Sequence, residues 1–258
     1  MIRLEEILET KRSEIAQLKQ HTPISVLLER IKHSHSPRNF YDALRKGNPA
    51  IIAEIKRASP SQGVLTEDFD HKTIAREYEQ GGAAALSVLT DRKFFQGDPS
   101  FIAEVREVST LPVLRKDFIL DEYQIFESRA IQADAVLLIV RALEQPILER
   151  LHTLALSLGL AVLVEVHDER DIDTANEMQA ELIGINNRNL SDYSVSLEHS
   201  LRLREKVHAN AIVISESGIR NDSDLVQLAK AGFHGVLIGE SLMRSENRIA
   251  SLKSLVRN

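Results

Sequence analysis

The stretch Ile51-Ile52-Ala53-Glu54-Ile55-Lys56-Arg57-Ala58-Ser59-Pro60-Ser61 decides how the rest of the chain is interpreted. Its first five residues are mostly apolar, which predicts a buried β-strand, and the strand then breaks into a Ser/Pro loop. Because side chains alternate between the two faces of a strand, Glu54 and Lys56 point the same way. Charges are rarely buried alone, so this pair is either a structural ion pair or part of a chemical site.

Seven further short apolar runs follow this first strand at fairly regular spacing. Most are apolar at consecutive positions, as expected for parallel strands covered on both faces. The predicted strands are Ile51–Ile55, Ala84–Leu89, Val113–Lys116, Ala135–Val140, Ala161–Val166, Leu182–Asn186, Ile212–Glu216 and Val236–Gly239. Helical periodicity fills the intervals between them. The predicted helices are Lys72–Gln80, Phe101–Glu107, Tyr123–Ala130, Gln145–Leu158, Asp171–Met178, Leu197–Val207, Asp224–Ala231 and Ser241–Val256.

Eight βα units predict a (β/α)8 TIM barrel, a fold of about 250 residues, and this chain has 258. The alternative is an open, doubly wound sheet. That fold is less favoured because the sequence has neither of the glycine-rich nucleotide motifs that would mark a crevice. We therefore expect one domain over residues 1–258, with eight βα units over 48–258 and a helical extension over 1–47.

The extension is predicted to hold three helices. Apolar residues from Leu4 to Leu18 recur at helical intervals. A second helix is expected to begin with Thr22 as N-cap and Pro23 in the first helical position, and a third to run from Asn39 to Lys46. Their apolar faces must be buried, so the extension should cover one end of the barrel.

Composition limits the function classes. The net charge is −6, so there is no basic field to attract nucleic acid. The chain has no cysteine, which excludes disulfides, zinc–thiolate sites and thiol nucleophiles. No apolar run approaches the roughly 18 residues of a membrane span. We expect a soluble, cytoplasmic protein that acts as a monomer without nucleic-acid or membrane partners.

Chemistry in a barrel is found at the carboxyl ends of the strands. Those ends bring together a set of acids and bases whose mutual proximity can shift their pKa values, as general acid–base catalysis requires. The candidates are Glu54, Lys56, Lys116, Glu165, Asn186, Arg188 and Glu216. A purely structural set of ion pairs is the competing interpretation.

Two glycine turns and one loop add to this picture. Ser217-Gly218 and Gly239-Glu240 follow the last two strands, where barrels often bind phosphate through backbone N–H groups. The loop from Arg57 to Asp70 is long for a βα connection, which suits either a lid or a mobile surface loop. The histidines lack metal-ligand spacing, so no metal is expected, and a solvated or capping role is expected around His167.

These segments resemble indole-3-glycerol-phosphate synthases over the whole chain. The resemblance is carried by residues 52–61, Leu114-Arg115-Lys116-Asp117-Phe118, Leu163-Val164-Glu165-Val166-His167, Ile185-Asn186-Asn187-Arg188-Asn189-Leu190, Glu216-Ser217-Gly218-Ile219 and Leu237-Ile238-Gly239. It implies a phosphosugar–anthranilate substrate, 1-(2-carboxyphenylamino)-1-deoxyribulose 5-phosphate, which loses CO2 and water to give indole-3-glycerol phosphate. It implies no cofactor, and it favours an extension that covers the catalytic mouth.

The resemblance also implies roles for the residues already singled out. Lys116 resembles the general acid for ring closure, and Glu165 the proton-transfer partner for dehydration. The remaining roles are substrate contact by the pair Glu54 and Lys56, orientation by Asn186, Arg188 and Glu216, binding of the rest of the substrate by Ser59, Phe118 and Leu190, and phosphate binding by Lys56, Ser217, Gly218, Gly239 and Glu240.

One residue departs from the resemblance, and two other functions remain as alternatives. Some relatives have a small hydroxyl residue where this chain has Glu240, so we expect its carboxylate to turn away and its N–H to face the phosphate. A phosphoribosylanthranilate isomerase would be expected to use a cysteine, and this chain has none. A non-catalytic phosphate-binding barrel would be expected to lack Lys116 or Glu165, and both are present.

Overall fold

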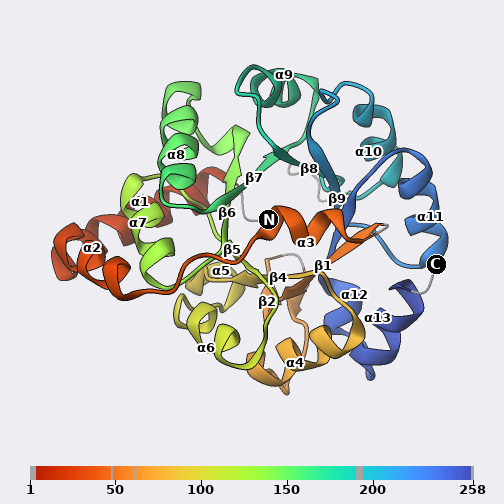
Figure 1. The fold of residues 1–258 in the computed structure, drawn as a ribbon, viewed down its shortest axis with the longest axis horizontal. Coiled ribbons are helices and arrows are strands. Elements are labelled where there is room, and N and C mark those ends of the chain that lie inside the picture. Colours follow the sequence, from red (N-terminus) through yellow and green to blue (C-terminus); the bar gives the residue numbers. More distant parts are fainter. Residues whose placement is uncertain (1–3, 48, 61, 190–193, 257–258) are drawn as a thin grey trace.

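A computed structural model describes residues 4–47, 49–60, 62–189 and 194–256 of the chain. Eight parallel strands form a closed barrel in the order β1-β10-β9-β8-β7-β6-β5-β4 (Figure 1). The strands are β1 (Ala50–Ile55), β4 (Ala85–Leu89), β5 (Val113–Lys116), β6 (Ala135–Ile139), β7 (Ala161–Val166), β8 (Leu182–Asn186), β9 (Ile212–Glu216) and β10 (Gly235–Ile238). Because β1 pairs with both β4 and β10, the sheet has no edge, and the open-sheet alternative is excluded.

Alternation along each strand divides the core into two layers. On β1, Ile51, Ala53 and Ile55 face outward and pack in the layer between strands and helices, whereas Ile52 belongs to the cluster inside the barrel. Glu54 shares the inward face with Ile52, since side chains two residues apart lie on one side. A slip of one residue would reverse both faces, so burial of the apolar layer also fixes which polar side chains point into the barrel.

Helices cover the barrel on the outside, and acidic or amide N-caps begin several of them. Asp70, Asp121, Asp168 and Asn221 each accept a backbone N–H at a helix start, which satisfies donors that have no partner in the first turn. The covering helices are α4 (His71–Gly81), α6 (Ser100–Val108), α7 (Glu122–Ala130), α8 (Gln145–Ser157), α9 (Glu169–Glu177), α10 (Leu197–Arg204), α11 (Asp222–Lys230), α12 (Glu240–Met243) and α13 (Arg248–Val256).

The structure departs from the predicted elements in the connections. The expected helix Ser241–Val256 is two helices, α12 and α13, because the Asn247 side chain accepts the N–H of Ala250 and begins a new helix. Three short elements were not predicted, namely α5 (Arg92–Phe95), the 3-10 turn η1 (Val140–Ala142) and the hairpin β2 (Ala58–Ser59) with β3 (Gly63–Val64). The hairpin lies within the long loop after β1.

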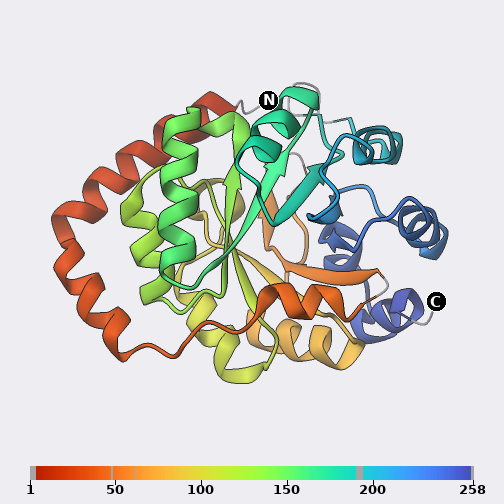
Figure 2. The same ribbon diagram turned by 45° about the horizontal axis from the view of Figure 1, so that its top comes forward.

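The N-terminal extension spans the height of the barrel. It consists of α1 (Leu4–His21), α2 (Ile24–His33) and α3 (Phe40–Arg45). In Figure 2 the red and orange helices α1 and α2 run beside α7, and α3 lies at the opposite end of the barrel from the start of α1. Phe40 and Leu44 of α3 join the inner cluster and close the bottom of the barrel. The expected N-cap is wrong by one residue, because Pro23 and not Thr22 occupies that position.

Candidate active site

The carboxyl ends of the strands enclose a cavity of about 590 Å³. The ends of β1, β5, β7, β8 and β9 and the loops after them contribute polar and charged side chains, and α1 adds apolar ones. Six of the polar residues expected from the sequence line this one cavity, namely Glu54, Lys56, Lys116, Glu165, Asn186 and Glu216. Strand alternation predicts the position of all six, since each lies on the inward face near the carboxyl end of its strand or directly after it.

Lys116 is the centre of the charged cluster. Its ammonium Nζ lies 2.5 Å from Glu216 Oε2 and 3.1 Å from Glu165 Oε2. Burial alone would lower the pKa of Lys116, but the charges of Glu216, Glu165 and Glu54 outweigh it and raise that pKa above the usual value. The lysine is therefore an ammonium at neutral pH, able to donate a proton or a hydrogen bond into the cavity.

The two carboxylates that share Lys116 differ in proton affinity. Burial raises the pKa of Glu216 to about 7, helped by the negative charge of Glu165, while Lys116 acts in the opposite direction. Burial also acts on Glu165, but the positive charge of Lys116 outweighs it and holds the pKa of that carboxyl below its usual value. A site with one ionised carboxylate and one carboxyl group whose pKa is close to neutral pH can both accept and supply protons.

Two glycines, Gly184 in β8 and Gly239 directly after β10, make room for carboxylates of the site. A Cβ at Gly184 would collide with the Glu216 carboxylate, and one at Gly239 would collide with that of Glu54. Glu54 in turn forms an ion pair with Lys56 two residues later, as the alternation on β1 predicts. Charged side chains are therefore packed closely at this end of the barrel, and they fit only because glycine occupies these two positions next to them.

The turns after β9 and β10 line the cavity. Ser217 and Gly218 have positive φ values of 69° and 82°, respectively. For a residue other than glycine this left-handed conformation costs on the order of 1 kcal/mol, and such strain is found most often at functional sites. Gly239 begins the short helix α12, and Arg220 also lines the cavity near these turns.

Glu240 lies between two arginines. Its Oε2 is 4.0 Å from Arg188 Nη2, and its Oε1 is 3.5 Å from Arg244 Nε. These contacts offset the repulsion that a carboxylate would exert on a bound phosphate, because each arginine brings a permanent positive charge. The expectation that Glu240 turns away from the phosphate stays a prediction.

Aromatic and apolar side chains line the remaining wall. Phe118 lies 6.2 Å from Phe95, measured between ring centroids, and both line the cavity together with Leu4 and Ile7 of α1. The expectation that the extension covers the catalytic mouth is therefore confirmed for α1, whereas α3 lies at the other end. Ser59 lines the cavity from β2, and Leu190 lies outside the described residues.

The expected solvated or capping role is wrong for His167. Its side chain is buried, with Nε2 3.3 Å from Glu165 Oε1. Burial lowers the pKa of His167, which makes the ring neutral at pH 7. The residue directly follows β7, and the neighbouring Asp168 provides the N-cap of α9.

The cavity-lining residues that sequence reasoning missed include Leu4, Ile7, Phe95, Arg220 and Arg244. Leu4 and Ile7 lie on the apolar helix face that the sequence predicted, so only the surface that this face covers was unknown. The arginines follow the two glycine turns closely, and a search for cations beside the expected phosphate site would have found them. Phe95 gave no signal, because it belongs to a short helix that was not predicted.

No group of three potential His, Asp or Glu ligands is close enough to hold a metal ion within the described part of the chain. Among the same residues, no helix is both long and apolar enough to cross a membrane.

The closed barrel and its charged mouth are those of a (β/α)8-barrel enzyme that works by acid–base chemistry. The model of one family, indole-3-glycerol phosphate synthase, matches residues 4–255. A protein of that name from Chlorobium luteolum is 51% identical over 249 residues, covering 95% of each chain. Another from a Polaromonas species is 45% identical over 256 residues, covering 98% of this chain and 97% of its own.

Solved structures of much lower sequence identity share the fold. A 3-hexulose-6-phosphate synthase has a TM-score of 0.64 at 14% identity and covers 81% of this chain and 98% of its own. A chain of the tryptophan synthase complex from Pyrococcus furiosus has a TM-score of 0.57 at 12% identity, with the same coverage of 81% and 98%. At such identities the likeness concerns the barrel alone.

The chain belongs to the indole-3-glycerol phosphate synthase family. It is a carbon–carbon lyase of tryptophan biosynthesis and acts on a small phosphate-containing substrate. The reaction converts 1-(2-carboxyphenylamino)-1-deoxyribulose 5-phosphate to indole-3-glycerol phosphate with loss of CO2 and water. One site must therefore form a carbon–carbon bond, break the carbon–carbon bond to the carboxylate, and break the carbon–oxygen bond of the leaving hydroxyl.

Proposed function

We propose that Lys116 is the general acid of ring closure. The aromatic carbon that carries the carboxylate attacks the substrate ketone, and negative charge develops on the ketone oxygen. A buried ammonium can stabilise that charge and then donate its proton, turning the ketone into a hydroxyl. The observation that carries this role is the contact of Lys116 with both Glu165 and Glu216, which keeps the lysine charged at the wall of the cavity.

Glu165 acts after CO2 has left. Loss of CO2 restores the aromatic ring, and departure of the hydroxyl as water then needs one proton delivered and another removed. An ionised carboxylate beside an ammonium can exchange protons in both directions, and general acid–base help of this kind is worth about 10²- to 10⁴-fold. The depressed pKa of Glu165 supports its role as a base at neutral pH.

The other residues hold the substrate. Lys56, paired with Glu54, attracts its anionic groups, and Asn186, Arg188 and Glu216 orient the carboxylate, the amine and the hydroxyls. Two bound ends fix the reacting carbon against the ketone, which can contribute several kcal/mol by removing rotational freedom before the reaction.

The phosphate and the ring occupy opposite parts of the cavity. Phosphate binds at the turns formed by Ser217, Gly218, Gly239 and Glu240, with Lys56 also in reach, and it accepts hydrogen bonds from backbone N–H groups. The ring packs against Phe118, and Ser59 and Leu190 contact the substrate nearby.

We further propose that the chain folds as one domain and works as a cytoplasmic monomer without a cofactor or a nucleic-acid partner. The net charge of −6 supports the absence of nucleic-acid binding. The substrate's own ring and amine supply the electron relay for decarboxylation.

A single-turnover experiment tests the two proton roles separately. Excess enzyme is mixed with substrate labelled at the carboxylate carbon, and released CO2 and indole product are followed together. Glu165→Gln should release CO2 in the first turnover while indole formation lags behind, because only dehydration is impaired. Lys116→Met should release neither on that timescale. A CO2 burst from the lysine variant would refute its role in ring closure, and absence of a burst from Glu165→Gln would assign Glu165 to an earlier step.

A further inference from the structure

A second buried lysine lies outside the cavity. Lys11 belongs to α1 and is only 4% exposed, although lysine is almost never fully buried unless it is paired. It is absent from the residues that line the cavity, which include its neighbours Leu4 and Ile7. Its burial therefore needs another explanation than contact with substrate.

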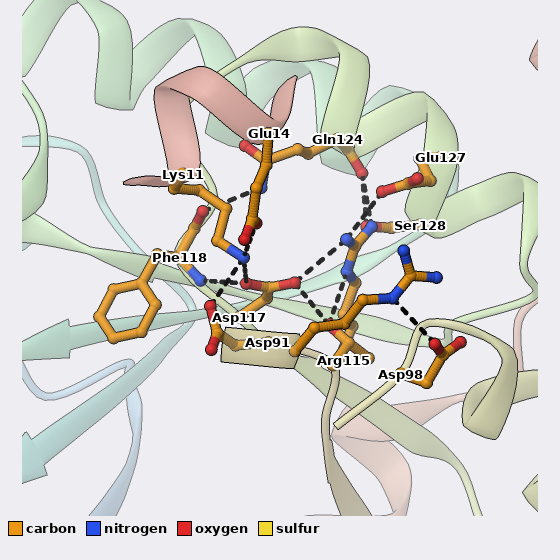
Figure 3. Close-up of polar contacts among 12 residues, drawn as sticks. Lys11, Glu14, Asp91, Asp98, Arg115, Asp117, Phe118, Gln124, Glu127 and Ser128 are labelled. Carbon is orange, nitrogen blue, oxygen red and sulfur yellow. Dashed lines mark hydrogen bonds and ion pairs between the residues drawn. The ribbon is translucent and has the colours of Figure 1, made fainter. Parts of the chain in front are cut away.

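Three carboxylates surround the Lys11 ammonium. Its Nζ lies 2.8 Å from Glu14 Oε2, 2.8 Å from Asp91 Oδ2 and 3.0 Å from Asp117 Oδ1. Figure 3 shows these side chains converging on it from α1, from the end of β4 and from the end of β5. Burial alone would lower the pKa of Lys11, but Asp117 and Asp91 outweigh it and raise that pKa, so the contact is an ion pair at neutral pH.

Asp117 connects this ion pair to the proposed general acid. It directly follows Lys116, and its Oδ1, the atom that Lys11 contacts, also accepts the N–H of Phe118 at 2.8 Å. Its Oδ2 accepts the Thr90 hydroxyl at 2.6 Å. The Asp117 side chain thus folds back on its own backbone, which sets the direction in which the residues on either side of it leave the strand.

Asp91 makes the same kind of connection at the neighbouring strand. It is the N-cap of α5, where its Oδ1 accepts the N–H of Phe94 at 2.7 Å. The same helix carries Phe95, whose ring lies 6.2 Å from that of Phe118. One ammonium therefore contacts the two carboxylates that fix the segments bearing the aromatic wall.

We propose that Lys11 is a positioning residue for the reaction: it joins the N-terminal extension to the ends of β4 and β5 and so fixes Lys116 and the aromatic wall of Phe95 and Phe118. This inference rests on the proposed roles of Lys116 and Phe118. Lys11 acts through Asp117 and Asp91 and touches no substrate. A displacement of about 1 Å at reacting groups can cost up to 10²-fold in rate, which is why such a distant contact matters.

The same helix offers a matched control. Lys19 of α1 also contacts an aspartate N-cap of the barrel, with Nζ 2.8 Å from Asp121 Oδ2. Both of these side chains are substantially exposed, and Asp121 adjoins no residue of the cavity. If Lys11 merely fastens the extension to the barrel, replacing either lysine should affect catalysis equally little.

The test compares Lys11→Met with Lys19→Met, well below the melting temperature of each variant. For Lys11→Met we expect KM to rise about 10-fold or more and kcat to fall several-fold, from the loss of alignment. Lys19→Met should stay within about twofold of the unchanged protein, as expected for an exposed pair. Two ligands then locate the defect. The alcohol obtained by reducing the substrate ketone cannot cyclise, and its affinity should fall in Lys11→Met, whereas inorganic phosphate should bind as before. Equal kinetics for the two lysine variants would overturn the proposal.

A charge-balanced variant separates positioning from stability. Lys11→Met/Asp91→Asn removes one buried carboxylate together with the lysine, and asparagine is as good an N-cap as aspartate. It should fold even if Lys11→Met does not, and it should keep the raised KM because Asp117 still lacks its contact with Lys11. Recovery of both stability and KM would show that Lys11 has a structural role only. Lys116→Met, measured in parallel, reports on the general acid independently, so failure of one proposal leaves the other testable.

Discussion

Lys116 and Lys11 form two buried clusters on opposite sides of one strand end. Each ammonium contacts carboxylates at 2.5–3.1 Å, and each has a raised pKa. Their carboxylate partners differ. Glu216 shares a single lysine with Glu165, and burial leaves its pKa at about 7. Asp117 is also buried, but it contacts both Arg115 and Lys11, and these cations hold its pKa below the usual range.

The comparison shows what makes an ion cluster reactive. In the cluster of Lys116, Glu216 pairs with one lysine only, and its pKa of about 7 lets its proton move at neutral pH beside the cavity. In the cluster of Lys11, Asp117 contacts two cations, and Lys11 itself does not line the cavity, so its contacts hold parts of the chain together. Residues 116 and 117 are neighbours in sequence, and strand alternation alone separates the two environments.

The largest expected effect on turnover comes from substitutions in the Lys116 cluster. Lys116→Met and Glu165→Gln should each lower turnover by several orders of magnitude, because each removes a proton donor or acceptor of the reaction. Circular dichroism and thermal unfolding should show an intact barrel. Turnover within a factor of ten of the unchanged enzyme for either variant would be incompatible with the assigned roles.

Deletion of residues 1–36 removes α1 and α2 and should act on binding. We expect a folded barrel whose KM is raised about 10-fold or more, since Leu4 and Ile7 no longer line the cavity and water enters it. Steady-state kinetics and calorimetric binding of phosphate provide the measurement. A truncated barrel with an unchanged KM would show that the extension contributes nothing to the site.

The contribution of the Lys11 cluster to the unfolding free energy should depend on pH. A carboxyl with a depressed pKa stabilises the fold above its unfolded pKa of about 4, and this contribution is lost as pH falls through the folded pKa. Lys11→Met leaves the buried Asp117 with one cation fewer, which should cost about 3 kcal/mol at pH 7.

Urea titrations of both proteins between pH 8 and pH 4 provide the measurement. The raised pKa of Lys11 keeps its own contribution constant over this range, since that contribution is lost only above its unfolded pKa. In the variant, Asp117 has one cation fewer and therefore a higher pKa than in the unchanged protein, so it takes up its proton at a higher pH. The difference in unfolding free energy should therefore be flat near neutrality and narrow as pH approaches 4. A difference that widens toward acid pH would argue against the ion pair.

The smallest expected effect is none. EDTA should leave turnover unchanged, because the chain has no cysteine and its histidines lack ligand spacing. The assay needs only purified enzyme, substrate and indole fluorescence, with EDTA-treated and untreated samples compared side by side. Activity that disappears on chelation and returns with a divalent metal would contradict the proposed proton chemistry.

Most of the fold was predictable because barrel strands are short, apolar and separated by helical periods. Every predicted strand is present within about one residue of its observed ends, as β5, β7 and β9 show. The points at which one helix ends and the next begins were harder to predict. Ser241–Val256 contains no proline or glycine, so only the side-chain cap at Asn247 marks the end of one helix and the start of the next. The short helix α5 is likewise too brief to leave a periodic pattern.

The sequence by itself determined which side chains reach the mouth. Alternation along a strand is a local property of the backbone, so Glu54, Lys116 and Glu165 could be placed on the inward face without knowing any neighbour. Tertiary structure alone decided which charge meets which. Lys11 and Asp117 are joined only when an extension helix docks on a strand end, and His167 is buried only because β7 is enclosed. Such contacts depend on segments far apart in the chain, and no local pattern records them.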